Sequence, residues 1–159
     1  MTRLDKSWNN FVLYYGSGLE NVLATFDLII LESSAQKQEF IKQLKVLGKT
    51  PIAYISGFEY PYNRADAEKR WHRYGLGVNS SWKPSWTNNY LMDLRRKDWQ
   101  EIVAEEMQRI MNIGYCGVFL DTLGVCQMPE LSQLAPNLLN ELILAAADTI
   151  SYLRRCFPD

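Results

Sequence analysis

Residues 117–123, GVFLDTL, decide the fold class of this chain. Val118, Phe119 and Leu120 follow one another without a polar break, which is typical of a short strand buried on both faces of a parallel sheet. Asp121 stands where this strand ends. Because a carboxylate there adds nothing to apolar packing and the next predicted helix begins well downstream, we interpret Asp121 as a functional residue.

Other short apolar segments alternate with amphipathic helical patterns. Strands are predicted at residues 11–16, 28–31, 51–56, 89–94 and 117–123, and helices at 19–26, 33–49, 97–114 and 136–155. Apolar strands joined by helical crossovers indicate an α/β fold with a parallel sheet of about five βα units. No low-complexity linker interrupts them, so residues 1–159 are expected to form a single domain. The connection 57–88 is long and aromatic, which favours a functional loop over disorder.

Composition excludes several classes of function. With 47% hydrophobic residues and a formal net charge of −1, the chain is not expected to bind nucleic acid. Three cysteines and a single histidine, His72, are too few ligands for a zinc site, and neither a metal nor another cofactor is expected. No apolar run is long enough to span a bilayer, and the first residues show no signal peptide.

Ligands of parallel sheets bind beyond the carboxyl ends of the strands. The polar and aromatic residues predicted there are Tyr14, Tyr15, Glu32, Ser33, Tyr54, Ser56, Glu59, Asp93, Asp121 and Thr122. A rim with several carboxylates suits glycoside hydrolysis, in which one carboxyl group acts as an acid beside an ionised partner. Aromatic rings of the long connection, Trp86 among them, suit stacking on sugars. Structural alternatives exist for some of these residues: Glu32 can cap the following helix, Asp93 can pair with Arg95 or Arg96, and the tryptophans can serve packing.

The motifs VLYYG, FDLIILES, GKTPIAYISGFEYPYNR, WTNNYLMDLRRKDWQEIV and NIGYCGVFLDTL occur in that order over the first 125 residues or so. Together they resemble the endo-α-1,4-polygalactosaminidase-type glycoside hydrolases, which cleave galactosamine-rich exopolysaccharide of bacterial biofilms. The resemblance implies a (β/α)8 TIM barrel, an extracellular or cell-envelope location and an acidic cleft for a polysaccharide substrate. It matches Asp121 and Glu59 to acids of that cleft, which we take as catalytic. It also matches Tyr54 and Glu32, which we expect, with Tyr14, Trp86, Asp93 and Thr122, to bind substrate.

Two departures from this family bear on the prediction. Gly124 stands where the family usually has a second acid three residues after the first. In addition, a barrel needs eight strands, and the family's glutamate on a later strand has no counterpart among the five predicted here. We therefore expect a partial barrel that lacks its C-terminal part. Its open edge predicts self-association.

Three functions stay open on the sequence alone. The chain is a glycoside hydrolase acting on a galactosamine-rich exopolysaccharide, a catalytically incomplete carbohydrate-binding relative, or a flavodoxin-like or receiver-like open parallel sheet. Strand order separates the folds, since a barrel arc has the order 1-2-3-4-5 and the open sheet has 2-1-3-4-5.

Overall fold

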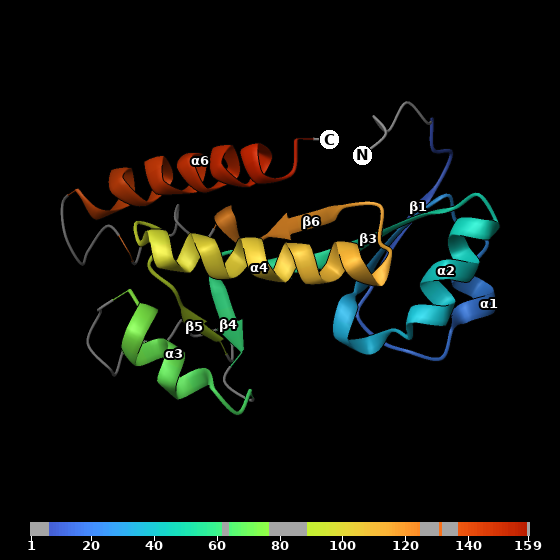
Figure 1. The fold of residues 1–159 in the computed structure, drawn as a ribbon, viewed down its shortest axis with the longest axis horizontal. Helices are drawn as coiled ribbons and strands as arrows, with labels where there is room; N and C mark the ends of the chain where they lie inside the picture. The colour runs from blue at the N-terminus through green and yellow to red at the C-terminus, as the bar shows by residue number, and fades with distance from the viewer. Residues whose placement is uncertain (1–6, 62–63, 77–88, 125–130, 132–136, 159) are drawn as a thin grey trace. The chain divides into compact units, whose positions relative to one another are not determined.

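The computed structural model describes residues 7–61, 64–76, 89–124, 131 and 137–158 of the chain (Figure 1). It consists of two compact units. The first contains residues 1–55 and 105–120, and the second contains residues 56–104 and 121–158.

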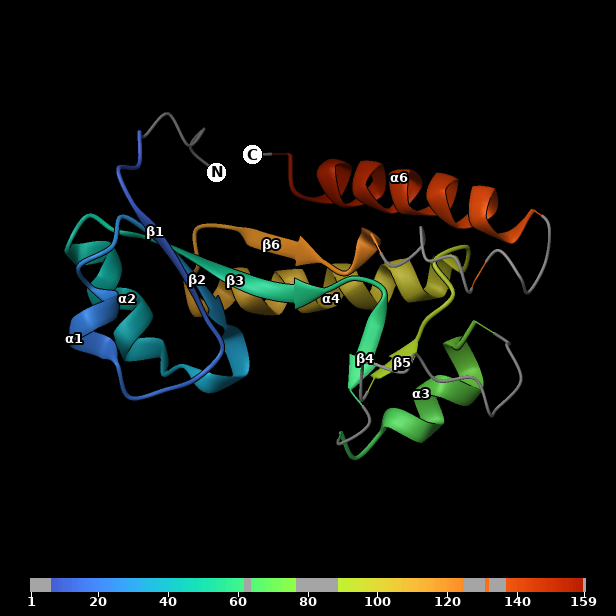
Figure 2. The same cartoon turned by 180° about the vertical axis from the view of Figure 1, so that it is seen from behind.

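The first unit is built on a four-stranded parallel sheet. Its strands are β1 (Phe11–Tyr14), β2 (Leu28–Glu32), β3 (Thr50–Ser56) and β6 (Val118–Asp121), in the order β1-β2-β3-β6. Figure 2 shows the arrows of β3 and β6 pointing the same way. Because β1 lies at the edge and not between β2 and β3, the order is that of a barrel arc, and the flavodoxin-like alternative is wrong.

Register and alternation divide the side chains of this sheet between two faces. On one face Ile29, Leu31 and Ala53 are fully buried. The crossovers are α1 (Glu20–Leu23), a short 3-10 helix η1 (Ser33–Ala35), α2 (Gln38–Val46) and α4 (Lys97–Ile113), whose residues from 105 onward belong to this unit. Phe40, Ile41 and Leu44 of α2 are buried, whereas Leu47, just after the helix, is 52% exposed. Gly48, at φ 74°, follows the last turn of α2.

The second unit corrects one predicted strand. Residues 89–94 were expected to join the parallel sheet as its fourth strand, but β5 (Asn89–Leu91) pairs antiparallel with β4 (Glu59–Pro61) in a separate two-stranded sheet. The prediction of five βα units is therefore wrong for the described residues, in which the parallel sheet has four strands. An apolar run indicates that a strand forms but does not show which strand it pairs with. The sequence pattern therefore gave the wrong partner for residues 89–94.

Helices and aromatic rings complete the second unit. It contains α3 (Ala67–Tyr74), the first turns of α4 and the long helix α6 (Leu138–Cys156). Trp99 is buried and donates its indole N–H to the carbonyl of Gly57 at 3.0 Å, while Trp71 stacks on Tyr90. Both rings thus contact other residues of this unit, whereas Trp86 lies outside the described residues. None of the helices in the described ranges is long and apolar enough to cross a membrane.

Candidate active site

Asp121 ends β6 and is followed by a strained residue. Thr122 has φ 66°, the left-handed region that a β-branched side chain rarely adopts. Its hydroxyl lies 2.7 Å from the Ser56 hydroxyl and accepts the N–H of Phe58 at 3.1 Å. It also donates to the carbonyl of Asp121 at 2.7 Å. These bonds hold the backbone at the candidate carboxylate in one conformation.

Glu59 is the first residue of β4, and its main chain is hydrogen-bonded to the same pair of hydroxyl groups. Its N–H donates to the Ser56 hydroxyl at 3.1 Å, while the N–H of Gly57 donates to the carbonyl of Asp121 at 2.9 Å. The two candidate catalytic residues of the second unit are therefore connected through their main chains by Ser56 and Thr122. Sequence reasoning had not singled out Ser56 for this role, because hydroxyl pairing across 66 residues leaves no local pattern.

The carboxyl group of Glu59 is buried, and the residue is only 7% exposed. Its Oε2 accepts a hydrogen bond from the side-chain amide of Asn89 at 2.6 Å, across the β4–β5 pair. Within the described part of the chain no lysine or arginine forms an ion pair with Glu59. Asn89 is a residue of this site that the sequence analysis did not select.

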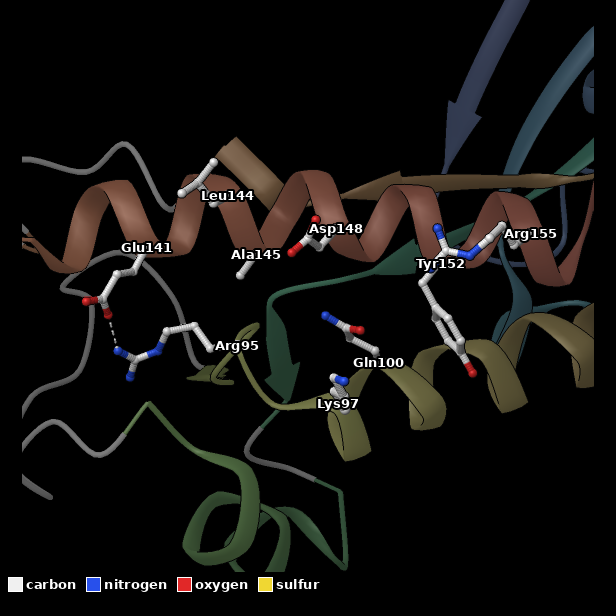
Figure 3. A pocket seen from close by; sticks show the side chains of 9 residues that line it. All are labelled: Arg95, Lys97, Gln100, Glu141, Leu144, Ala145, Asp148, Tyr152 and Arg155. Atoms are coloured by element: carbon white, nitrogen blue, oxygen red, sulfur yellow. Dashed lines mark hydrogen bonds and ion pairs between the residues drawn. The ribbon is translucent and has the colours of Figure 1, made fainter.

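Asp93 is engaged by a neighbouring cation. The guanidinium of Arg95 contacts both of its carboxylate oxygens at 2.8 Å, and the N–H of Arg95 donates to one of them. Arg95 also reaches Glu141 of α6 at 2.6 Å (Figure 3). Hydrogen bonds from both carboxylates raise the pKa of Arg95. The structure thus shows the ion-pair alternative for Asp93, and its contact with substrate stays a prediction.

The hollow in Figure 3 has a volume of about 550 Å³ and lies between the first turns of α4 and helix α6. Its lining mixes basic, acidic and apolar side chains, with Arg95, Lys97, Arg155, Glu141 and Asp148 among the charged ones. It contains none of the predicted catalytic or substrate-binding residues.

In the first unit, Glu32 and Tyr54 lie side by side at the carboxyl end of the sheet. One oxygen of Glu32 accepts the N–H and hydroxyl of Ser34, so the capping interpretation is confirmed. The Tyr54 ring meets Tyr15 edge-on at 5.0 Å and stacks with Phe119 at 6.3 Å. Tyr54, Tyr15 and Phe119 therefore form an aromatic cluster beside Glu32.

Tyr14 lies elsewhere. It is in register with Leu31, one residue before Glu32, so alternation places its side chain on the opposite face of the sheet. Its hydroxyl donates to the carbonyl of Ser17 at 2.9 Å. Tyr15, which the sequence analysis did not select as a site residue, is the tyrosine that contacts Tyr54. The alternation of residues 11–16 was the signal that could have distinguished the two.

The surroundings of Glu32 include one arginine that is already paired. Arg109 of α4 contacts both carboxylate oxygens of Glu106, at 2.6 and 2.8 Å, and approaches the buried Ser33 hydroxyl at 3.4 Å. Among the residues that the structure describes, Glu32 forms no ion pair, and no group of three potential ligands is arranged to hold a metal ion.

The chain is similar to several known proteins. The glycoside hydrolase domain of PelA from Pseudomonas aeruginosa is 27% identical and superposes with a TM-score of 0.81, covering 96% of this chain and 57% of that one. Aspergillus fumigatus Ega3, solved in complex with galactosamine, shares the fold with a TM-score of 0.63 at 15% identity, over 90% of this chain and 55% of that one. An uncharacterized protein of Methanocaldococcus jannaschii is 28% identical over 134 residues, which are 76% of this chain and 39% of that protein.

This chain therefore spans only part of the length of each of these relatives. The model of glycoside-hydrolase family GH114 matches residues 3–157, and the chain belongs to that family.

Proposed function

We propose that this protein is a glycoside hydrolase acting on a galactosamine-rich polysaccharide, with Asp121 and Glu59 as its catalytic carboxyl groups. Membership of family GH114 supports the reaction class. Similarity to the PelA domain and to Ega3, which was solved with galactosamine, supports the substrate class. An extracellular or cell-envelope location accords with this proposal.

The main support for assigning Asp121 and Glu59 as the catalytic pair is the contact between the hydroxyl groups of Ser56 and Thr122. Glycoside hydrolysis requires two carboxyl groups held at a defined separation. Here the hydroxyl of Thr122 bonds the main chain of Asp121, and the hydroxyl of Ser56 bonds the main chain of Glu59. Thr122 keeps an unfavourable left-handed backbone in this arrangement. Backbone strain that is retained in this way is typical of functional sites.

Each carboxyl group has a distinct proposed role. Asn89 donates to Oε2 of Glu59, which leaves Oε1 to carry a proton toward the glycosidic oxygen. Glu59 is therefore the proposed general acid. Asp121, at the end of β6, is the proposed carboxylate that faces the sugar ring or its attacking water.

Substrate contacts are proposed for the first unit. Glu32 bonds Ser34 through one oxygen, which leaves the other for the ammonium group of an amino sugar. Tyr54 and Tyr15 offer ring surface beside it. Thr122, predicted to bind substrate, has its hydroxyl committed to protein partners, so its proposed part is to hold Asp121 in place.

The test uses a de-N-acetylated α-1,4-galactosamine polymer. Wild-type protein should release oligosaccharides, detected by mass spectrometry and by new reducing ends. Asp121→Asn and Glu59→Gln should each lower the rate by about 100-fold or more. Asp98→Asn is the matched control, because Asp98 is a partly exposed acid whose ion pair among the described residues is with its neighbour Arg96. Equal rates for Asp121→Asn and Asp98→Asn would contradict the assignment.

A second candidate function is carbohydrate binding without hydrolysis. The burial of Glu59 and the presence of Gly124 in place of an acid favour it. In that case wild-type protein retains the polymer on an affinity gel and releases no oligosaccharide. Asp121→Ala then weakens retention.

A further inference from the structure

The carboxyl group of Glu59 is paired with an uncharged donor. Among the residues that the structure describes, its side chain is hydrogen-bonded to the amide of Asn89, at 2.6 Å. Glu59 is buried, so little water competes with this bond. A lysine or arginine at this distance would favour an ionised carboxyl group, whereas a neutral amide can donate to a carboxyl group in either form. Asn89 therefore suits a carboxyl group whose charge changes during a reaction.

Strand pairing places the two side chains together. In the antiparallel β4–β5 pair Glu59 is opposite Leu91, and Asn89 is opposite Pro61. Alternation puts these four residues on one face of the pair. Glu59 and Asn89 are diagonal neighbours on that face, at a separation that their side chains can bridge. A shift of β5 by one residue would turn Asn89 to the other face and break the bond.

The helix α3 and the residues after it support β5 on its other side (Figure 2). The N–H of Leu76 donates to the carbonyl of Leu91 at 3.1 Å. The ring of Trp71 in α3 stacks on Tyr90, the residue next to Asn89, with ring centroids 5.0 Å apart. These contacts hold β5 in one register, and with it the amide of Asn89 against Glu59.

We propose that Asn89 is a positioning residue of the hydrolytic reaction, which acts through Glu59. The inference rests on the proposed function, in which Glu59 is the general acid. In the acid step the proton on Oε1 passes to the glycosidic oxygen, the bond from that oxygen to the anomeric carbon breaks, and its electron pair stays on the leaving oxygen. Glu59 is left as a carboxylate, and the bond from Asn89 strengthens because hydrogen bonds to ionised groups are stronger. Asn89 then stabilises the transition state more than the bound substrate, so its loss should lower kcat and leave KM nearly unchanged.

Hydrolysis of two substrates by the full chain tests this role. One is the de-N-acetylated α-1,4-galactosamine polymer, and the other is a galactosamine oligosaccharide with a dinitrophenyl leaving group, which departs without a proton. Asn89→Ala should lower kcat on the polymer by about 10- to 100-fold, with KM changed by less than about threefold. On the dinitrophenyl substrate its rate should stay within about threefold of wild type, because no general acid is needed there. A variant that only disturbed the fold would lose the same factor on both substrates.

Two further variants separate the hydrogen bond from the shape and charge of the side chain. Asn89→Asp keeps the shape but replaces the N–H donor with an acceptor, and should lose polymer hydrolysis as Asn89→Ala does. Asn112→Asp is the matched control, because Asn112 is exposed on α4 and its side-chain oxygen accepts from Gln108 at 3.1 Å, a bond that an aspartate can keep. This control should hydrolyse both substrates at the wild-type rate. Unchanged polymer hydrolysis in Asn89→Ala overturns the proposal, as do equal losses on the two substrates.

Failure of this role can be told from failure of the proposed function. If Glu59→Gln loses polymer hydrolysis and Asn89→Ala does not, the positioning role is wrong and the general acid stands. If wild-type protein hydrolyses neither substrate, the proposed function fails, and nuclear magnetic resonance of the Asn89 side-chain amide decides whether it holds Glu59. Its signal should move in Glu59→Gln and stay in place in Asp98→Asn, and a signal that moves in neither overturns the proposal. These spectra need no substrate and no substitution of Asn89, so they also decide if the Asn89 variants fail to fold by circular dichroism.

Discussion

At the scale of single residues, Thr122 combines an unfavourable backbone conformation, φ 66°, with a hydroxyl group that both accepts and donates hydrogen bonds. The side chain accepts from Phe58 and donates to the carbonyl of Asp121, and both bonds require the oxygen. Thr122→Ser keeps that oxygen and should leave stability nearly unchanged. Thr122→Ala keeps the left-handed strain without the bonds and should cost about 1–3 kcal/mol.

Urea denaturation of the two variants measures this difference. Thr122→Gly is a useful third variant, because glycine relieves the strain while still losing the hydroxyl and should fall between the other two. Equal stabilities of the serine and alanine variants would show that the hydroxyl does not hold this turn.

The position of Asp121 at the end of a strand could be predicted, since an apolar run followed by an acid is a local pattern. The choice between Tyr14 and Tyr15 required the register of β1 against β2, which adjacent tyrosines do not reveal. The hydrogen bonds of Ser56 and Asn89 were not predicted, for another reason. Their partners lie 66 and 30 residues away along the chain, and only the folded structure brings them together.

Tyr115 is buried with a hydroxyl that has no hydrogen-bond partner in the described structure. Burial, with a smaller contribution from the negative charge of Glu32, raises the pKa of Tyr115 to about 12. Tyr115→Phe removes an unsatisfied polar group and should keep or raise stability at pH 7, by up to about 1–3 kcal/mol.

The same variant should change the alkaline limb of the stability curve. A pKa above the unfolded value favours the neutral phenol in the folded state, so this contribution is present below about pH 10 and lost toward pH 12. Thermal unfolding at pH 9 and 11 should show a smaller loss for Tyr115→Phe than for wild type. A larger loss in the variant would contradict the burial argument.

At the scale of elements, Asp27 joins the starts of three strands. Its carboxylate accepts the N–H of Asn9 before β1 and pairs with Lys49 before β3, and its carbonyl accepts the N–H of Thr50. The N–H of Asn9, followed by Lys49, lowers the pKa of Asp27 below 3.8. The stabilisation is therefore present above the unfolded pKa and lost as pH falls through the folded value.

Asp27→Asn should accordingly unfold at a lower temperature than wild type at pH 7, and the gap should shrink as the pH falls below 3.8. Asp148→Asn serves as control, since Asp148 is an exposed acid on α6 with no ion pair among the described residues. A gap for Asp27→Asn that stays constant with pH would assign its effect to packing and not to charge.

The strands and helices of the first unit were largely predictable, because the spacing of apolar residues along a segment indicates whether it forms a strand or a helix. The β4–β5 pair was not, since β4 has only three residues and its partner follows after a long excursion that includes α3. The helix α3 was hidden by its polar composition, with only Ala67 buried along it. Its His72 is exposed and lies 3.8 Å from Glu68, one turn earlier.

At the scale of the whole molecule, β3, α4 and β6 each have residues in both compact units. The chain passes from one unit to the other within these elements and not through flexible linkers. Loss of either end of a strand or helix removes hydrogen bonds from the other end. We therefore expect the two units to unfold in one cooperative transition, in keeping with the single domain predicted from the sequence.

Ile29→Ala tests this cooperativity, because Ile29 is fully buried in the first unit and its truncation should cost about 2–5 kcal/mol. Native-state hydrogen exchange then compares β2, in the first unit, with α6, in the second. If the units unfold together, the slowest amides of both elements should lose the same free energy of opening in the variant. Val46→Ala, at an exposed position of the first unit, should change neither. Loss of protection in β2 with α6 unchanged would show that the units unfold independently and that the single-domain prediction is wrong.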